Sequence, residues 1–382
     1  MKWFYVPLED IAPAQASNRR FSPNNKVWHL TLDQIESDTG NVVDKKYAPA
    51  ADAGISTYTF DDGNVLYSRL RPYLNKVLCP TESGIATTEL VPLRPRKDLL
   101  DRQYLTYYLR SNRFLSFANV AVAGVKMPRI IMAKFWKHKI PLPPFSEQRR
   151  IVEILDQADA LRKKRAEADA KAARILPALF YKMFGDPATN PKRWKLTSFD
   201  DTFDDCTAQV PKLQRIAYQK AGRYPVIDQS KEFIAGYTDD SSLVKPFKKP
   251  VIVFGDHTRI VKLVDFPFVA GADGTRVFSA KINFLPAFLA TQLQLQPIPN
   301  LGYSRHMREV RRLMFIAPPV ERQELFAKCV MSASPFLKSQ GTCNLRIENL
   351  FQTLLHRAFA GDLTAKWREA HMKELLQEME QQ

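Results

Sequence analysis

Ile140-Pro141-Leu142-Pro143-Pro144-Phe145-Ser146-Glu147-Gln148 decides the fold, because a second version occurs near the end of the chain as Pro318-Pro319-Val320-Glu321-Arg322-Gln323. Each version leads into a long charged stretch that ends in a Gly-Asp dipeptide, at Gly185 and at Gly361. Gln148 and Gln323 are 175 residues apart, and the two glycines are 176 apart. A repeat of this length indicates one duplicated unit and not a solenoid of short repeats, so it predicts a pseudo-twofold chain.

A shorter echo precedes each version of the motif. Gly124-Val125-Lys126-Met127-Pro128-Arg129 comes before the first, and Gly302-Tyr303-Ser304-Arg305-His306-Met307 comes before the second. The duplication therefore includes the segment before each long helix as well as the helix itself.

Positive charge is concentrated in two parts of this 382-residue chain, whose net charge is +16. Residues 1–140 and 188–315 each carry +7, whereas residues 141–187 carry +2 and residues 316–382 carry no net charge. A positive excess attracts polyanions, and duplex DNA carries one negative charge per about 1.7 Å of its axis. The two basic segments therefore favour nucleic acid as the partner.

Composition also bears on the location of the protein. No apolar run approaches the roughly 18 residues of a membrane helix, and the first residues lack a signal-peptide pattern. The four cysteines show no Cys-x-x-Cys spacing. We therefore expect a reduced, cytoplasmic protein.

The chain divides into four segments of alternating character, which predicts an α+β fold. Residues 1–140 and 188–315 are two mixed α/β domains, and residues 141–187 and 316–382 each contain a long helix, the second followed by a polar tail. Runs bounded by Gly and Pro predict strands at 65–68, 84–93 and 251–254. Apolar spacing predicts helices at 99–117 and 282–295.

The first long helix shows a heptad pattern that predicts antiparallel pairing with the second, as a coiled coil. A helix of about 40 residues spans about 60 Å. Pro177 is expected to kink this helix or start a new one, and Gly185 to end it. Pro335 and Gly341 predict a less regular second helix, and the tail from Lys366 is expected to fray. The heptad positions are Ile151, Ala158, Arg165, Ala172 and Leu179 at a, and Ile154, Leu161, Ala168, Ile175 and Lys182 at d.

Motifs for catalysis do not occur in the sequence. The chain has no Gly-x-Gly, so it carries neither a dinucleotide fingerprint nor the cofactor loop of a typical methyltransferase, and it has no P-loop lysine motif. Its six histidines do not form metal-ligand spacings. The sequence therefore predicts no catalytic, cofactor-binding or metal-binding residues.

The duplicated plan resembles one known family, the specificity subunits of type I restriction–modification systems. The resemblance rests on residues 140–152 leading into the first long helix, on residues 179–186 at its end and on residues 354–364 at the end of the second. The second Pro-Pro motif departs from the pattern, because it continues as Val320-Glu321-Arg322-Gln323 and lacks the Phe-Ser-Glu-Gln-Arg run of the first version.

The resemblance implies a non-catalytic chain that recognises DNA. Each basic segment would be a target recognition domain that reads one half of a bipartite, asymmetric site in double-stranded DNA. The paired helices would fix the gap between half-sites and dock two methylation subunits, which carry S-adenosylmethionine, and a restriction and translocation subunit can join them. The helix residues expected at these contacts are Ile151, Ile154, Leu161, Ile175, Leu179, Leu337, Phe351 and Leu355.

Base-edge reading requires polar and basic side chains on loops that can enter a groove, while other cations hold phosphates. Arg69 and Arg259 are the leading candidates, because each follows a predicted buried strand. The DNA-binding residues predicted in the first domain are Ser68, Arg69, Arg71, Tyr73, Lys76, Thr87, Thr88, Lys126 and Arg129. Those predicted in the second are Asp256, His257, Thr258, Arg259, Thr275, Arg276, Tyr303, Arg305 and His306.

Two other functions remain open at this point. The chain could be the specificity part of a fused restriction and methylation enzyme with diverged catalytic residues, although the missing cofactor loop argues against this. It could also be a coiled-coil adaptor that binds only protein, although the two basic segments argue against that.

Overall fold

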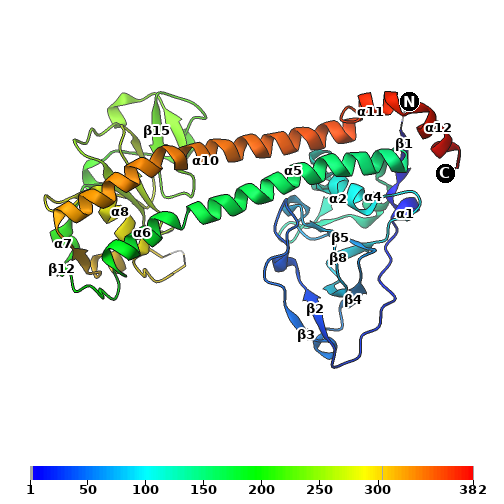
Figure 1. Ribbon diagram of the computed structural model, residues 1–382, viewed down its shortest axis with the longest axis horizontal. Coiled ribbons are helices and arrows are strands. Elements are labelled where there is room, and N and C mark those ends of the chain that lie inside the picture. The colour runs from blue at the N-terminus through cyan, green and yellow to red at the C-terminus, as the bar shows by residue number, and fades with distance from the viewer. Residues whose placement is uncertain (1–2, 303, 382) are drawn as a thin grey trace. The chain divides into compact units, whose positions relative to one another are not determined.

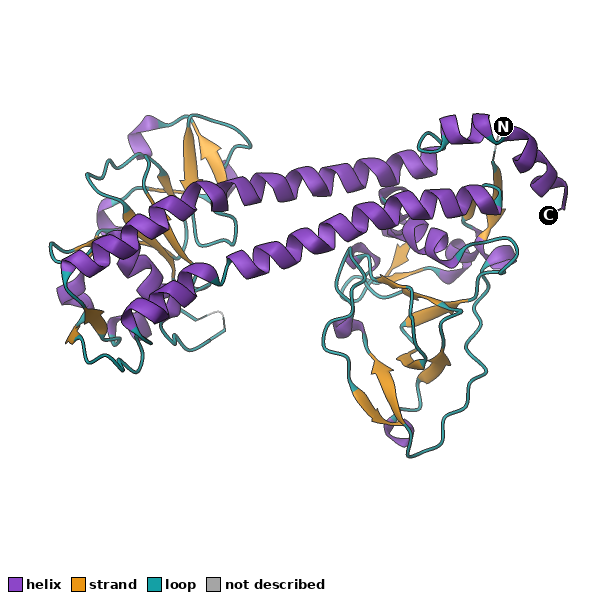
Figure 2. Cartoon of the chain, viewed as in Figure 1, coloured by secondary structure: helices purple, strands orange, loops and turns teal. Residues whose placement is uncertain are grey.

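The computed structural model describes residues 3–302 and 304–381, and for residues 334, 335, 337–342 and 381 it describes the backbone only. The chain forms two compact units: unit 1 comprises Met1–Arg165 and Cys343–Gln382, and unit 2 comprises Ala166–Thr342. The long helices α5 (Phe145–Ala172) and α10 (Val320–Ala360) each contribute to both units (Figure 1). Each unit mixes helices and strands, which confirms the predicted α+β class (Figure 2).

Unit 1 contains a four-stranded sheet of order β3-β2-β7-β4, a three-stranded sheet of order β6-β5-β8, and two pairs, β1-β11 and β10-β9. Its strands are β1 (Phe4–Pro7), β2 (Lys26–Leu30), β3 (Tyr47–Pro49), β4 (Thr57–Phe60), β5 (Val65–Ser68), β6 (Val77–Leu78), β7 (Gly84–Thr87), β8 (Leu90–Leu93), β9 (Val122–Ala123), β10 (Arg129–Ile130) and β11 (Lys139–Leu142). Its shorter helices are α1 (Leu8–Ile11), α2 (Arg102–Arg110), α3 (Asn112–Val120), α4 (Met132–Lys137), α11 (Ala365–Ala370) and α12 (Met372–Gln381).

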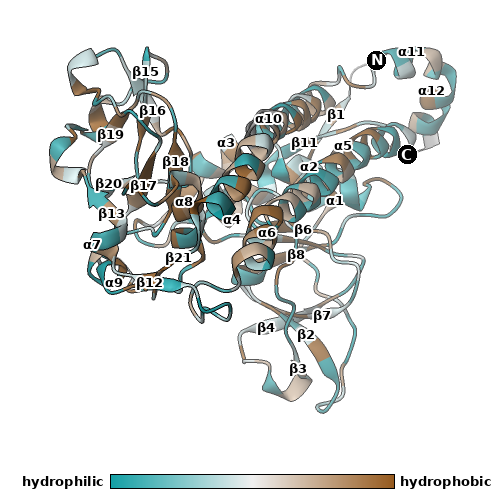
Figure 3. Cartoon of the chain, turned by 60° about the vertical axis from the view of Figure 1, so that its left-hand side comes forward, coloured by the Kyte–Doolittle hydropathy of each residue, from teal (hydrophilic) through white to brown (hydrophobic). Residues whose placement is uncertain are grey.

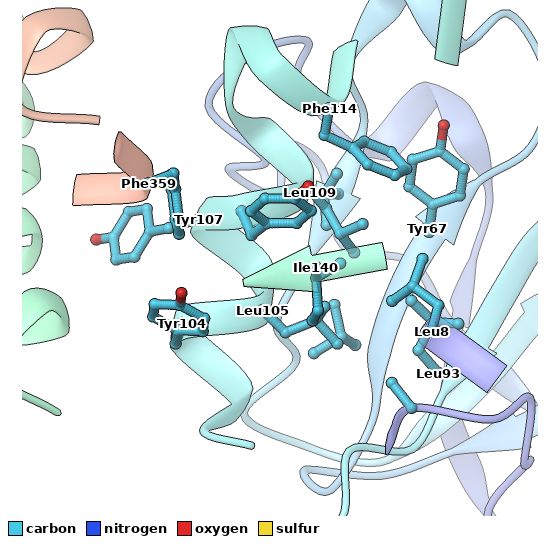
Figure 4. Packing of buried hydrophobic residues seen from close by; sticks show 14 of the residues in the cluster. Leu8, Tyr67, Leu93, Tyr104, Leu105, Tyr107, Leu109, Phe114, Ile140 and Phe359 are labelled. Carbon is cyan, nitrogen blue, oxygen red and sulfur yellow. The ribbon is translucent and has the colours of Figure 1, made fainter. Parts of the chain in front are cut away.

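The core of unit 1 lies where α2 packs between the strands and the long helices. Tyr104, Tyr107 and Tyr108 of α2 are all buried, and their rings contact Phe351 and Phe359 of α10 at centroid distances of 5.1–6.3 Å. The close-up in Figure 4 shows Phe359 beside these tyrosines. The C-terminal part of α10 is therefore built into the same core as the first mixed segment.

Unit 2 contains two four-stranded sheets, of order β13-β20-β17-β18 and β14-β19-β15-β16, and the pair β12-β21. Strands β17 and β18 and helix α8 are strongly apolar, as Figure 3 shows. The strands are β12 (Lys195–Thr197), β13 (Phe203–Asp205), β14 (Lys212–Leu213), β15 (Tyr224–Ile227), β16 (Gly236–Thr238), β17 (Val251–Gly255), β18 (Val261–Val264), β19 (Val269–Gly271), β20 (Thr275–Ala280) and β21 (Phe315–Ala317). The shorter helices are α6 (Ile175–Phe184), α7 (Phe199–Thr202), α8 (Pro286–Leu295) and α9 (Met307–Arg311).

The duplicated glutamines explain why the Pro-Pro motif recurs. The Gln148 amide is fully buried: its Oε1 accepts from the backbone N–H of Asp101 (2.8 Å), and its Nε2 donates to the carbonyls of Leu99 (2.7 Å) and Pro143 (2.9 Å). Each set of three bonds is called a glutamine clamp here, because it ties the long helix to the segment that begins the preceding short helix.

Gln323 forms the same clamp in unit 2. Its Oε1 accepts from Leu285 N–H (3.0 Å), and its Nε2 donates to the carbonyls of Asn283 (3.2 Å) and Pro318 (2.9 Å). The strand before each Pro-Pro pair also closes its unit, since β11 pairs with β1 and β21 pairs with β12, both antiparallel. The repeated sequence is therefore a repeated structural frame.

Two predicted helices differ from the structure at their boundaries. The helix expected over 99–117 is two helices, α2 and α3, because Ser111 adopts an extended conformation and its hydroxyl accepts from Phe114 N–H to cap α3. The helix expected from Ile282 begins at Pro286, whose ring favours the first turn. Pro177 follows a break after α5 and lies in the first turn of α6, as predicted.

The predicted d positions of α5 are wrong by one residue. Ile151 and Ala158 are buried as predicted, but Leu161 is exposed, and so is Ile175, which lies in α6 beyond the end of α5. The contact stripe continues instead through the buried Leu155 and the half-buried Arg162, whose guanidinium lies 4.2 Å from the ring centroid of Phe351 and bonds Glu348 (2.9 Å). The shift arises because α5 faces both α2 and α10, so its contact stripe is wider than a two-helix seam. Within unit 1 the two helices run antiparallel, with Arg162 opposite Glu348 and Arg165 bonding Asn344.

The C-terminal tail is docked on the start of α5, which contradicts the expected fraying. The fully buried Glu147 carboxylate accepts hydrogen bonds from Thr364 Oγ1 (2.6 Å), Arg368 Nε (2.8 Å) and Trp3 Nε1 (3.1 Å). Glu378 of α12 accepts from the N–H and hydroxyl of Ser146. Both described ends of the chain therefore meet at one carboxylate.

Among residues 3–302 and 304–381, no helix has both the length and the apolar character required to cross a membrane.

Replacing Gln148 by Ala is expected to lower the free energy of unfolding by about 2–4 kcal/mol, because the buried Pro143 carbonyl and two half-buried backbone groups lose their partner. Hydrogen exchange would rise in unit 1 around residues 99–105, whereas Gln323→Ala would raise it in unit 2 around residues 283–289. Gln157→Ala, at an exposed position of α5, is the matched control. Equal effects of Gln148→Ala and Gln157→Ala would contradict a structural role for the clamp.

Replacing Glu147 by Ala is expected to release the tail, because Thr364 and Arg368 both lose their acceptor. Limited proteolysis followed by mass spectrometry should then cut within residues 362–381 faster than in the wild type. The control is Glu153→Ala, which removes only an exposed pair with Arg150 of the kind that contributes little to stability. Protection of the tail in Glu147→Ala would show that its other contacts, among them the Glu378–Ser146 hydrogen bonds, hold it without Glu147.

Candidate nucleic-acid interface

Three loops of unit 1 meet at one end of the strand pair β5-β8. Ser68 at the end of β5 pairs with Leu90 at the start of β8, so the loop after β5 and the turn before β8 lie together. The hairpin β9-β10 joins them, because Arg71 N–H donates to the Pro128 carbonyl (2.7 Å) and Ile130 N–H donates to the Arg69 carbonyl (2.9 Å). This end of the strands therefore collects most of the residues predicted to contact DNA.

A carboxylate organises the cations of this surface. Glu89 accepts from Arg69 Nε (3.0 Å) and, through both its oxygens, from the Arg129 guanidinium (2.7 Å at the shortest). The hydrogen bond from Arg129, with that from Arg69, holds the pKa of Glu89 below its usual value, although partial burial opposes the shift. The carboxylate is therefore ionised at neutral pH, and it fixes the directions of two arginines that retain further donors.

The remaining predicted residues of unit 1 fall into three groups. Arg71, Tyr73, Thr88 and Lys126 are exposed, and Thr87 is half-buried. Arg71 has a left-handed backbone (φ 49°). Lys76 donates to the Leu32 carbonyl (2.7 Å) and thereby holds a neighbouring loop. Ser68 is buried and its hydroxyl donates to the Leu70 carbonyl, so the prediction that it contacts DNA is wrong and its role is to shape the turn.

In unit 2 the corresponding acid is Asp256, which follows β17. Its carboxylate is fully buried and accepts from the Arg276 guanidinium (2.9 Å) and from Met307 N–H (2.7 Å). His306 is also fully buried: its Nδ1 lies 2.7 Å from the Asp256 carbonyl, and its Nε2 accepts from Leu301 N–H (3.2 Å). Asp256 and His306 therefore stabilise the loop 299–305 through hydrogen bonds made from buried positions.

Burial corrects three of the predictions for unit 2. Asp256, His306 and Thr275 have no exposed surface or almost none, so they cannot reach DNA in this structure. Sequence alone does not distinguish a polar residue that supports a loop from one that the loop presents. Arg276, half-buried beside Asp256, and Arg305, which is exposed, remain as candidate contacts. Tyr303 lies outside the described residues.

The loop after β17 is held by a residue that the sequence analysis did not single out. Gln229 accepts from His257 N–H through its side chain (3.1 Å) and from the Thr258 hydroxyl through its carbonyl (2.6 Å). Arg259 has a left-handed backbone (φ 61°) and donates to the Ile298 carbonyl (2.9 Å), so it ties this loop to the loop 299–305. His257 and Arg259 are half-buried and Thr258 is exposed.

Lys212, which was also not predicted, adds a third cation to the surface of unit 2. Burial, and after it the charges of Arg276 and Arg305, lower the pKa of the Lys212 ammonium. The charges of Asp273 and Asp256 also act on Lys212 and oppose this shift, so cations and acids are mixed at this surface. Lys212 begins β14 in a segment without strong periodicity, so the sequence carries no signal that singles it out.

The long helices present only some of the predicted partner contacts. Ile151, Phe351 and Leu355 lie in the core of unit 1, so they pair the helices within the chain and are not free for another protein. Ile154 and Leu179 are half-buried, while Leu161 and Ile175 are exposed. The side chain of Leu337 lies outside the described residues.

A metal centre is not formed by the described part of the chain, which has no cluster of three or more His, Cys, Asp or Glu side chains suited to hold an ion.

The chain is similar in sequence to known proteins over part of its length. Residues 1–169 match the model of the type I restriction modification DNA specificity domain. The chain is 24% identical over 225 residues to the type I restriction enzyme EcoDI specificity subunit of Escherichia coli, covering 57% of this chain and 49% of that protein. It is 28% identical over 146 residues to the MjaVIII specificity subunit of Methanocaldococcus jannaschii, covering 37% and 33%. The matches thus span about half or less of these relatives.

Solved structures share the fold over nearly the whole chain. The S subunit of a type I restriction-modification system from M. genitalium aligns with a TM-score of 0.56 at 12% identity, covering 94% of this chain and 96% of that one. A chain from a study of complex assembly and conformational transition of the type I R-M system aligns with a TM-score of 0.53 at 17% identity, covering 95% and 98%. Residues 1–169 are thus similar to the type I restriction modification DNA specificity domain, and the chain as a whole shares the fold of these solved subunits.

Proposed function

We propose that this chain is the non-catalytic DNA-recognition subunit of a cytoplasmic type I restriction–modification complex. Each unit reads one half of a bipartite, asymmetric site in double-stranded DNA. Because the loops of the two units differ in sequence, the two half-sites differ as well. The chain itself recognises the DNA sequence and catalyses no reaction.

One observation carries the proposal: each unit places basic side chains in or beside the ends of its strands, and a carboxylate fixes their directions. Glu89 holds Arg69 and Arg129 in unit 1, and Asp256 holds Arg276 in unit 2. An arginine held in one direction presents its remaining donors with little further loss of entropy, as bidentate reading of guanine requires. Exposed cations beside each carboxylate, Arg71 and Lys126 in unit 1 and Arg305 in unit 2, suit contacts to phosphates.

The long helices provide surfaces for partner proteins. Leu161 and Ile175 on α5 and α6, and Leu325, Met331 and Phe336 on α10, are exposed apolar side chains on helices. Such side chains favour contact with another protein. We assign them to two methylation subunits, which would carry S-adenosylmethionine, with a restriction and translocation subunit joining the complex. The helices would also set the gap between the half-sites.

The deciding experiment maps methylated adenines across the genome of a host that expresses this chain with its neighbouring methylation subunit. The control host expresses the methylation subunit alone. A split, asymmetric motif that requires this chain is the expected result, and it names both half-sites. If the two proteins copurify and no new motif appears, the chain is an adaptor or inhibitor and not a reader.

Replacing Arg71 by Ala is expected to weaken binding about equally on every sequence and to reduce the salt slope by about one, because Arg71 is assigned to a phosphate contact. A loss of about 1–3 kcal/mol on the mapped motif that relaxes one base position would contradict this and assign Arg71 to a base. Affinity is measured by fluorescence anisotropy over a range of salt concentrations.

Lys97→Ala is the matched control, because Lys97 is exposed beyond the opposite end of β8 from Glu89. It should leave both affinity and salt slope unchanged. A loss as large as that of Arg71→Ala would show that the loops around Glu89 are not the binding surface.

A further inference from the structure

The hairpin β9-β10 ends in an exposed apolar tip. Ala123 pairs with Arg129 and Val122 with Ile130, which leaves residues 124–128 as the connection. At this tip Val125 is 100% exposed and Met127 is 48% exposed, with the exposed Lys126 between them. Single exposed apolar residues are common on proteins, so this tip indicates a binding site only when it is considered together with the residues around it.

Those surroundings hold the tip rigidly and make it basic. Gly124 has a φ of +92°, and a Cβ there would lie 3.2 Å from the Met127 carbonyl oxygen, so the turn is tight and suits glycine. Arg129 at the base of the hairpin bonds Glu89, and Pro128 accepts from Arg71 N–H. Two apolar side chains are therefore presented on a fixed loop surrounded by cations.

Unit 2 repeats this combination in the loop that corresponds by sequence. Leu301 is 45% exposed, precedes Gly302 (φ +66°) and lies four residues before the exposed Arg305. Its N–H donates to His306 Nε2, and His306 is in turn held by Asp256. An exposed apolar side chain on a loop with an exposed cation is thus found in both copies of the duplicated plan, on segments that correspond by sequence.

We propose that each loop inserts its apolar side chains between neighbouring base pairs, Val125 and Met127 in one half-site and Leu301 in the other. Apolar side chains wedged into a base step unstack it partially and kink the duplex, and flexible pyrimidine–purine steps accept this most easily. The surrounding cations favour DNA as the occupant over an apolar protein surface. The inference rests on the proposed function and deepens it, because it adds reading of DNA deformability to reading of base edges.

The test uses the complex of this chain with its methylation subunit and duplexes that carry the mapped motif. 2-Aminopurine replaces one base at a time, with the methylated adenines left unchanged, and its fluorescence rises where a base loses stacking. The wild type should raise the fluorescence at one step in each half-site. The double variant Val125→Ser/Met127→Ser should lose the rise in one half-site, and Leu301→Ser should lose it in the other.

Val120→Ser is the matched control, because Val120 is exposed at the end of α3, just before the hairpin and away from its tip. It should keep both signals. Binding of DNA without any rise, or a rise that survives Val125→Ser/Met127→Ser, would overturn the wedge and leave the proposed function intact. Absence of binding to the motif would overturn both.

Discussion

Two buried amides hold the frame on which everything else in this chain depends. Gln148 and Gln323 are fully buried, and each joins three backbone groups, of which the Pro143 and Pro318 carbonyls would otherwise be buried without a partner. An unpaired buried backbone group costs more than the bond contributes, so each glutamine is required and not merely favourable. The long helix, the Pro-Pro segment and the start of the short helix are thereby fixed together, and the sheets are built from that junction.

The loops are stabilised by a different kind of interaction from the one that stabilises the frame. Their arginines are only partly buried, and one acid in each unit organises them, the half-buried Glu89 or the fully buried Asp256. The frame is thus held by neutral amides and the loops by ion pairs, which involve different residues. The loops can therefore carry different side chains in the two units while the frame stays the same.

The repeat, the α+β class and the long helices could be predicted because each is a pattern of many residues. The buried Leu155 could not, since packing against α10 depends on neighbours distant in sequence. The helix break at Ser111 rests on a local cap, the hydrogen bond from Phe114 N–H, which the spacing of apolar residues does not reveal. The same limit applies to the interface. The sequence located the basic loops around Arg69 and Arg276, but the burial of Asp256 and His306 follows from tertiary contacts that their residue types do not reveal.

The contacts at Glu147 also constrain the order in which the two units can fold during synthesis. Unit 2 is one continuous segment, whereas unit 1 requires residues from both ends of the chain. Glu147 lies 144 residues after Trp3 and 221 residues before Arg368, and contacts across such separations form slowly. Unit 2 can therefore fold while the ribosome is still at work, but unit 1 reaches its final state only when the last helices have emerged.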